Sequence, residues 1–352
     1  MEWDFYFSLI KIIFLTTLSF VLAIFFTPAL THFLYKHKLG KAIRSNGATP
    51  VFTQMHEKKE GTPTMGGIVI WLSVLVLAVL FFYLGTFFPF FAKLNFLSRA
   101  QTLLPLGVLI ASAIVGLFDD LMDIRGKGAG GLRMRHRIII YTLIALAGAL
   151  WFYFKLDWDV IHVPFFGNFS IGWWYIPIFL FIIFATAFSV NETDGLDGLA
   201  GGCLLYAFVA YGAIACMLNK YDLAAFCGVI VGALLAFLWF NIYPARFFMG
   251  DTGAMALGVT LGVIAMLTNY ALLLPVVGFI FVIEALSFII QIVSKKIRKK
   301  KAFVSAPIHH HLEATGWPEP KIVMRFWIIA IVMGALGIVI FLLDRGFSIM
   351  PA

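Results

Sequence analysis

Long apolar runs separated by short polar segments make up most of the chain. Runs that approach the roughly 20 helical residues needed to cross a hydrocarbon core of about 30 Å occur near residues 9–35, 64–84, 102–118, 138–154, 173–190, 198–217, 223–243, 254–270, 272–294 and 325–343. We therefore predict an all-α integral membrane protein with about ten transmembrane helices. The whole chain, residues 1–352, is expected to form a single polytopic membrane domain.

The basic residues indicate which segments face the cytoplasm. Of the 26 Lys and Arg residues, 20 lie in the segments 36–63, 119–137, 191–197, 243–253 and 295–325. Cytoplasmic loops of membrane proteins are enriched in Lys and Arg, so these five segments are predicted to be cytoplasmic. An even number of spans then leaves both termini on the outer, periplasmic side, where the loop 155–172 is expected to form a small β-hairpin.

Composition agrees with a membrane protein and argues against nucleic-acid binding. The chain is 62% hydrophobic and 12% charged, whereas a soluble globular protein has about 25% charged residues. Its net charge of +8 follows the membrane topology, and the basic run 295–301 is typical of an anchor against anionic lipid headgroups. Recruitment of a phosphate-bearing substrate is an added role for that run. The chain has three cysteines, Cys203, Cys216 and Cys227. They lack the spacing of metal ligands and are interpreted as small core residues.

Several acidic residues gather where the predicted spans meet the cytoplasm. The chain has only 18 Asp and Glu residues, and a carboxylate at a helix centre costs about 2.5–3.5 kcal/mol on insertion scales. Carboxylates from separate helices at a membrane boundary suit Mg²⁺, which binds one or two carboxylates together with water and substrate phosphates. A phosphoryl-transfer site at the cytoplasmic face is therefore predicted around Asp119, Asp120, Asp194, Asp197 and Asp251.

The Asp119–Asp120 pair and Asp251 also have simpler interpretations. Asp119 and Asp120 could be solvated charges at a helix end, although the C-terminal end of a helix disfavours anions. Adjacent helical side chains diverge by about 100°, so the two carboxylates cannot both face one ligand. Asp251 could be a helix N-cap or a metal ligand beside a helix N-terminus that favours phosphate.

The stretch 191–198 concentrates polar residues between two apolar runs. Asn191, Asp194 and Asp197 recur every three residues, so a continuing helix would align them on one face. Gly195 and Gly198 would leave the backbone open for close approach by a ligand. Capping and turn chemistry is the alternative, because Asn, Asp, Thr and Gly are what helix ends require.

Three consecutive histidines follow the basic run. His309, His310 and His311 cannot converge on one metal from regular structure, so a zinc site is not expected. Imidazoles that donate to phosphate oxygens or orient a base fit better, and a solvated loop is the alternative. Glu284, inside the ninth run, needs a polar partner, and Gln291 lies two turns away.

Five motifs in order resemble one enzyme family along essentially the whole chain. They are the segments 59–67 (Lys-Glu-Gly-Thr-Pro-Thr-Met-Gly-Gly), 119–120 (Asp-Asp), 191–200 (Asn-Glu-Thr-Asp-Gly-Leu-Asp-Gly-Leu-Ala), 248–253 (Phe-Met-Gly-Asp-Thr-Gly) and 307–313 (Pro-Ile-His-His-His-Leu-Glu). Together they resemble the phospho-N-acetylmuramoyl-pentapeptide transferases, the lipid I-forming branch of the polyprenyl-phosphate N-acetylhexosamine-1-phosphate transferase superfamily. The motif with three histidines resembles that branch rather than the N-acetylglucosamine branch.

The resemblance implies an Mg²⁺-dependent phosphoglycosyl transferase of peptidoglycan synthesis in the bacterial inner membrane. It would react UDP-N-acetylmuramoyl-pentapeptide with undecaprenyl phosphate to give lipid I and UMP, and a homodimer is compatible with it. Asp251 would be the metal ligand, and the catalytic residues would be Asp119, Asp120, Asp194, His309, His310 and His311. Substrate would be bound by Lys59, Asn191, Gly195, Leu196, Asp197, Asn241 and Phe248.

Two positions depart from the family pattern. Asp123 stands where the family often has Lys, so a pyrophosphate contact would be missing or supplied by Arg125 or Lys127. Glu192 stands where an apolar residue is usual. The competing functions are a sister transferase that uses UDP-N-acetylglucosamine, a secondary transporter and a non-catalytic binding protein, but transporters carry their charged residues within the spans.

Overall fold

The computed structural model describes residues 2–40, 59, 61–99, 101–126, 131–132 and 134–349. Parts of the predicted loops 36–63 and 119–137, Lys127 among them, lie outside these residues. The helices are α1 (Glu2–Lys36), α3 (Ile68–Phe87), α4 (Pro89–Ala92), α5 (Leu103–Arg125), α6 (Met134–Lys155), α7 (Tyr175–Thr193), α8 (Leu199–Met217), α9 (Tyr221–Asn241), α10 (Asp251–Thr268), α11 (Leu274–Val277), α12 (Phe279–Ile297), α13 (Ile308–Ala314) and α14 (Glu319–Ile349), with short 3-10 helices at Gly172–Trp174 and Ala271–Leu273.

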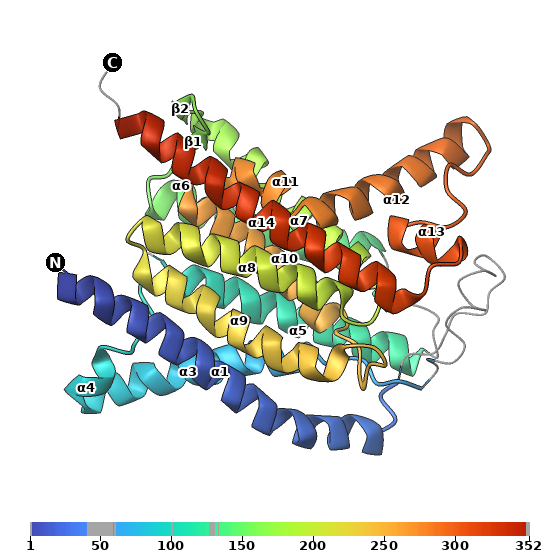
Figure 1. Cartoon of the computed structure of the whole chain (residues 1–352), viewed down its shortest axis with the longest axis horizontal. Helices are drawn as coiled ribbons and strands as arrows, with labels where there is room; N and C mark the ends of the chain where they lie inside the picture. The colour runs from blue at the N-terminus through green and yellow to red at the C-terminus, as the bar shows by residue number, and fades with distance from the viewer. Residues whose placement is uncertain are drawn as a thin grey trace.

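The prediction of a helical membrane protein is confirmed. Within the described ranges, nine helices are long and apolar enough to span a membrane, and residues 271–297 supply a tenth if they count as one span. That segment differs from the straight helix predicted for 272–294, because its two parts meet at an angle of 82° beside Gly278. Figure 1 shows α12 leaving the bundle after this break and lying near α13.

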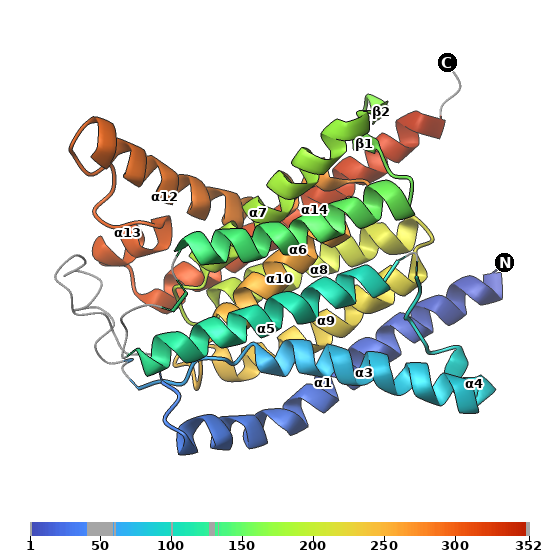
Figure 2. The ribbon, with the colours of Figure 1, turned by 180° about the vertical axis from the view of Figure 1, so that it is seen from behind.

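Helix α10 forms the centre of the bundle. Its span is 94% buried, whereas the outer spans in α1 and α14 are only 22% and 28% buried. It packs against α5, α7 and α8, and it lies behind α14 and α8 in Figure 1 and behind α6 and α5 in Figure 2. Apolar residues all round a helix can face either other helices or lipid, and α10 is the span enclosed most completely by its neighbours.

The two ends of the helix bundle are formed by different elements. Figure 1 shows both chain termini at one end, where the hairpin of β1 (Val160–Val163) and β2 (Gly167–Ser170) also lies. The antiparallel pairing of Val160 with Ser170 and of Val163 with Gly167 confirms the hairpin predicted in the loop 155–172. The opposite end gathers α13, the N-termini of α10 and α14 and the C-terminal ends of α5, α7 and α9.

Candidate active site

Two acidic side chains from different helices meet around one arginine. Asp119, near the end of α5, forms an ion pair with Arg137 of α6, and the same guanidinium lies 3.0 Å from Oδ2 of Asp251 at the start of α10. The Asp119 carboxyl is also within hydrogen-bonding contact of Asp251. The backbone N–H of Leu132 donates to the other oxygen of Asp119, so this carboxyl is held from two sides. The pair brings together the predicted metal ligand and one predicted catalytic acid.

Asp120 points to a different place, as the divergence of adjacent helical residues predicts. Its two carboxylate oxygens accept the backbone N–H groups of Asp251 and Thr252, both at 3.1 Å. The N-cap of α10 is Gly250, which has no side-chain cap of its own. The interpretation of Asp251 as a helix N-cap is therefore wrong, because Asp120 of α5 caps the helix instead and leaves the Asp251 side chain for Arg137.

The polar stretch after the fifth span does not continue as a helix. Helix α7 ends at Thr193, and Asp194 is its C-cap with φ −79° and ψ 55°. Asn191, still helical, donates its amide to Oδ1 of Asp251 at 2.8 Å, whereas Asp197 lies beyond the turn and contacts other elements. The predicted single face of Asn191, Asp194 and Asp197 is wrong, because the turn separates them.

A second cluster forms around Lys59, which stands just before α3. Its Nζ lies 2.7 Å from Oδ1 of Asp197 and 2.6 Å from Oε1 of Glu319, at the start of α14. The same Nζ lies 5.9 Å from the ring centroid of Phe248. Burial opposes the charge of Lys59, but the carboxylates of Glu319 and Asp197 outweigh it, so the pKa of Lys59 is raised. Lys59 is therefore a fixed cation at neutral pH.

Asn241 holds two loops of this cluster together. Its side-chain oxygen accepts the N–H of Gly198 at 3.0 Å, and its amide donates to the carbonyl of Phe247 at 2.8 Å. Asp197 adds a parallel link, because its Oδ2 accepts the N–H of Ala245 at 3.0 Å. Leu196 is only 4% exposed. Gly198, with φ +82°, adopts a conformation that favours glycine.

His309 and Glu284 form a fully enclosed pair. Nδ1 of His309 lies 2.9 Å from Oε2 of Glu284, and both side chains are 0% exposed. This pairing supplies the polar partner predicted for Glu284, whereas Gln291 instead binds the backbone of residues 302 and 303. Among the described residues, neither Nε2 of His309 nor the other oxygen of Glu284 has a hydrogen-bond partner. Nε2 faces Gly195, whose missing Cβ would lie 2.2 Å from it.

The ring nitrogens of the three consecutive histidines point to different partners. His310 Nδ1 lies 2.8 Å from Oε2 of Glu313 within α13. His311 accepts the N–H of Val304 at 3.3 Å and packs edge-on against Phe303. The rings of His309 and His310 lie against each other, with centroids 4.0 Å apart, but the nitrogens of the three histidines contact different partners. Among the residues that the structure describes, no group of three or more His, Cys, Asp or Glu side chains converges as a metal site.

Comparison with known proteins identifies the family. The model of glycosyl transferase family 4 matches residues 102–269, and signature 1 of phospho-N-acetylmuramoyl-pentapeptide-transferase matches residues 59–70. The phospho-N-acetylmuramoyl-pentapeptide-transferase of Chloroflexus aggregans is 41% identical over 92% of this chain and 88% of its own length. The chain belongs to this family. The transferases of Geobacillus thermodenitrificans and Bacillus subtilis are 40% and 37% identical, over 92% and 94% of this chain and 95% and 97% of theirs.

Two residues of the site, Arg137 and Glu319, were not predicted from the sequence. Arg137 belongs to a basic segment that the positive-inside rule already explained, so nothing set it apart. Its one signal is position, because a cation in the first turn of a helix is unfavourable and needs a nearby anion. Glu319 carried no such signal, because an acid in the first turn of a helix is favourable and its partner Lys59 lies 260 residues away.

The positions that depart from the family pattern lie at this same end. Asp123 is 9% exposed on α5, and its neighbour Arg125 ends that helix. Glu192 is half-buried on α7, close enough to interact electrostatically with His309, Glu284 and Asp251. Glu192 therefore places a further carboxyl group near both the Asp251 pair and the buried histidine.

Proposed function

We propose that the protein transfers phospho-N-acetylmuramoyl-pentapeptide from UDP-N-acetylmuramoyl-pentapeptide to undecaprenyl phosphate, giving lipid I and UMP in peptidoglycan synthesis. The observation that carries this proposal is the meeting, at one end of the bundle, of the family signature at residues 59–70 with the acidic pair of Asp119 and Asp251. The relatives that are similar to this chain over almost its whole length are named for this reaction.

The nucleotide half of the donor fits the Lys59 cluster. A half-buried aromatic ring beside a fixed cation suits a nucleobase and its phosphates, because bases stack on aromatic faces and Lys binds phosphate as a point charge. Phe248 supplies the ring, and Lys59 supplies the cation at 5.9 Å from it. Asp197, one carboxylate oxygen of which is held by Ala245, completes a polar wall for the uracil or ribose.

The residues around Asp251 fit an Mg²⁺ ion held jointly with substrate. Mg²⁺ is usually bound by one or two carboxylates, with water and phosphate oxygens as its other ligands, so two carboxyls suffice. Asp119 and Asp251 contact each other and share the single charge of Arg137, so both carboxyls can ionise together only with a further cation beside them. The ion would neutralise the pyrophosphate as charge develops on the departing UMP. Asp251 is its proposed ligand, with Asp119 beside it and Asn191 orienting the carboxylate.

The lipid phosphate is proposed to attack directly. An oxygen of undecaprenyl phosphate forms a bond to the sugar-linked phosphorus, and the bond from that phosphorus to the UMP oxygen breaks, with UMP leaving as an anion. Asp119 is the better candidate than Asp120 for positioning the acceptor, because it lies against Arg137 and Asp251, whereas Asp120 caps the backbone of α10. Glu284 fixes the orientation of His309, and the enclosed His309 ring packs against Gly195 and so positions the turn that follows α7.

The active site is proposed to face the cytoplasm of a bacterium, in a chain that crosses the inner membrane many times with both termini outside. The basic segment 295–301 lies at the same end as α13, and the hairpin and both termini lie at the other. This distribution agrees with the enrichment of Lys and Arg in cytoplasmic loops.

One assay separates this proposal from its rivals. Purified protein is incubated with undecaprenyl phosphate, Mg²⁺ and either UDP-N-acetylmuramoyl-pentapeptide or UDP-N-acetylglucosamine, and UMP release is measured. We expect release with the muramoyl donor only, its loss on chelation with EDTA, and a fall of at least about 10²-fold for Asp251→Asn. Release with the glucosamine donor alone would indicate the sister transferase, and release with neither would favour a transporter or a binding protein.

A further inference from the structure

A polar cavity lies at the end of the bundle remote from the candidate active site. It has a volume of about 600 Å³ and is lined by the first turns of α1, the segment after α4, the start of α5 and the turn between α8 and α9. That volume is in the range of small-molecule sites, about 300–1,000 Å³. Helix α9 separates the two sites, since its 21 residues correspond to about 30 Å.

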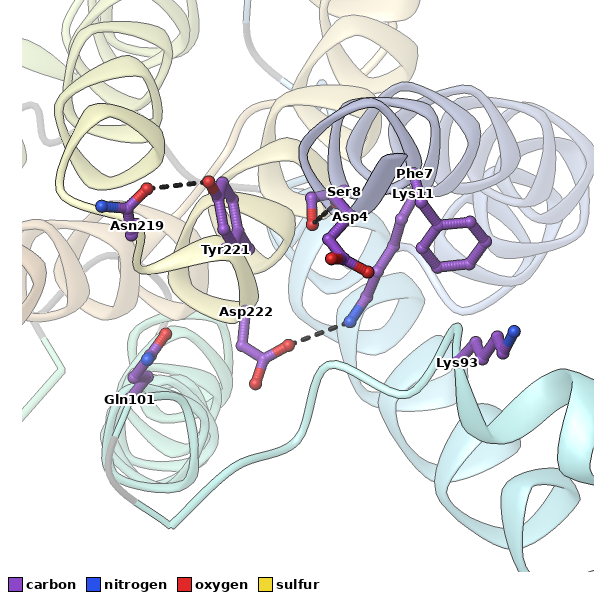
Figure 3. A pocket seen from close by; sticks show the side chains of 9 residues that line it. All are labelled: Asp4, Phe7, Ser8, Lys11, Lys93, Gln101, Asn219, Tyr221 and Asp222. Atoms are coloured by element: carbon purple, nitrogen blue, oxygen red, sulfur yellow. Dashed lines mark hydrogen bonds and ion pairs between the residues drawn. The ribbon is translucent and has the colours of Figure 1, made fainter. Parts of the chain in front are cut away.

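The cavity contains charged groups of both signs. Lys11 is 8% exposed, and its Nζ donates to Oδ1 of Asp222 at 2.9 Å and to the carbonyl of Asn95 at 2.7 Å. Figure 3 shows the Lys11 side chain reaching down from α1 to this carboxylate. Lys93 and Asp4 also line the cavity, so two ammonium groups and two carboxylates surround it. Its net charge is therefore zero at neutral pH.

Aromatic side chains stand among these charges. The ring centroid of Phe7 lies 5.7 Å from Nζ of Lys93, and Tyr221 lies next to Asp222 in the lining. The Asp222 side chain is 31% exposed, so it remains accessible from the cavity. A carboxylate with an aromatic residue beside it, as Asp222 has Tyr221, suits an ammonium group, because both attract a cation.

The outside of the cavity is strongly apolar. On α1 next to it, Phe5, Tyr6 and Ile10 are 43%, 56% and 62% exposed, and Phe90 of α4 is 71% exposed. The span of α1 begins at Asp4, so Lys11 lies about 10 Å along the helix from its start. The cavity thus reaches from the membrane boundary into the bilayer, with its charged interior beside side chains that suit lipid tails.

From this combination we propose that the cavity binds the headgroup of a zwitterionic phospholipid with a primary ammonium, that is, a phosphoethanolamine headgroup. The lipid phosphate is bound by Lys93 at the rim, and the ammonium is bound by Asp222 and Asp4 beside Tyr221. The acyl chains lie against the exposed apolar face of α1. The neutral lining disfavours an anionic headgroup, and a primary ammonium can donate hydrogen bonds to both carboxylates, which a quaternary one cannot.

Lipid retention by the full-length protein tests this site. Delipidated protein in detergent is offered phosphatidylethanolamine, phosphatidylcholine or phosphatidylglycerol with identical acyl chains, and bound lipid is counted by native mass spectrometry. We expect phosphatidylethanolamine to bind at least about tenfold more tightly than either alternative. Asp222→Asn and Lys93→Gln should each remove this preference. Asp157→Asn and Lys155→Gln are the matched controls, because both side chains are exposed at the same end but outside the cavity.

Three results would overturn the proposal: equal binding of all three lipids, preference for phosphatidylglycerol, or a preference that survives both cavity substitutions. Free phosphoethanolamine that binds as tightly as the lipid would assign the cavity to a soluble ligand and would also overturn it. Lys93→Gln keeps the test decisive if Asp222→Asn unfolds, because Lys93 is exposed on the surface. The assay needs no sugar nucleotide, so its outcome is independent of the proposed transferase activity.

Discussion

Arg137 balances the charge of two acidic side chains that come from different helices. Its guanidinium contacts both Asp119 and Asp251, and its side chain is only 23% exposed. The planar fork of Arg directs one terminal nitrogen to Asp119 and the other to Asp251, a fixed geometry that the point charge of Lys does not impose. In the described structure its Nε is buried without a partner, so the two terminal nitrogens provide its anchoring. Arg137 therefore sets the distance between the two carboxyls before substrate arrives.

Arg137→Met should disrupt this arrangement. Without the guanidinium, Asp119 and Asp251 repel each other, and we expect kcat/KM for UMP release to fall by roughly 10²-fold. Arg137→Lys should give an intermediate value. The control is Arg135→Met, two residues away but exposed. If Arg137→Met turned over at the parent rate, the shared arginine would have no role in the site.

Glu313 should make stability depend on pH. Burial, followed by the charge of Glu319, raises the pKa of Glu313 from 4.5 to about 7. Between these two values the folded protein holds a proton that the unfolded chain releases, so stability falls as the pH rises through that window. We expect the difference in Tm between the parent and Glu313→Gln to change between pH 4.5 and pH 7. A difference that stays constant across this range would contradict the assignment.

At the scale of elements, the close approach of α5 and α10 positions both carboxyls. A Cβ at Gly116 of α5 would lie 2.4 Å from the carbonyl oxygen of Asp251 and 2.6 Å from the Cα of Thr252. These are backbone atoms, which cannot rotate away. The Thr252 hydroxyl donates to the carbonyl of Ala113 at 2.8 Å, and Asp120 caps α10 from the same helix. Helix α5 thus fixes the first turn of α10.

Gly116→Ala tests this contact. The added methyl group should force the helices apart, at a cost of about 1–3 kcal/mol for overpacking, and lower both Tm and the rate of UMP release. Gly107→Ala is the control on the same helix, since nothing lies within 4 Å of its added Cβ. That change should leave Tm unchanged or raise it, because Ala favours helix by about 0.5–1 kcal/mol. Equal effects of the two substitutions would argue against close packing at Gly116.

The positions of the helices were predictable where hydrophobicity determines them. Their ends and bends were not predictable where contacts between distant segments determine them. Apolar runs long enough to span a membrane located the helices, because backbone groups in lipid must be satisfied within a helix. The end of α7 at Thr193 was not predictable, since Asn-Glu-Thr-Asp-Gly suits both a helical face and a turn. Pro275 and Gly278 mark a possible break in the ninth apolar run, but they do not give the bend of 82° that the structure shows beside Gly278.

On the scale of the whole molecule, the site residues were recognisable but their pairings were not. The residue types that bind metal and phosphate stood out against an apolar background. Lys59 meets Glu319 across 260 residues and Asp197 across 138, because the bundle brings together the segment before α3, the turn between α7 and α8, and the start of α14. Sequence spacing within one segment carries no information about them.

The proposed orientation in the membrane can be tested by labelling. Single cysteines are introduced as Phe166→Cys in the hairpin and Lys299→Cys after α12, where both parent residues are exposed. In intact cells a membrane-impermeant maleimide should label the first site, and the second should react only after lysis, because the basic loop is expected in the cytoplasm. The parent chain is the control for its own three cysteines. The reverse pattern would place the candidate active site outside.

The capping of α10 by Asp120 decides how a phosphate can approach its first turn. A free helix N-terminus attracts phosphate through its N–H groups, but here a carboxylate of the protein accepts the N–H groups of Asp251 and Thr252. An incoming pyrophosphate therefore meets acidic side chains and one arginine, and it must bring its own counterion. We expect the sugar nucleotide to enter as a preformed metal complex, so that the metal-free nucleotide competes poorly for the site.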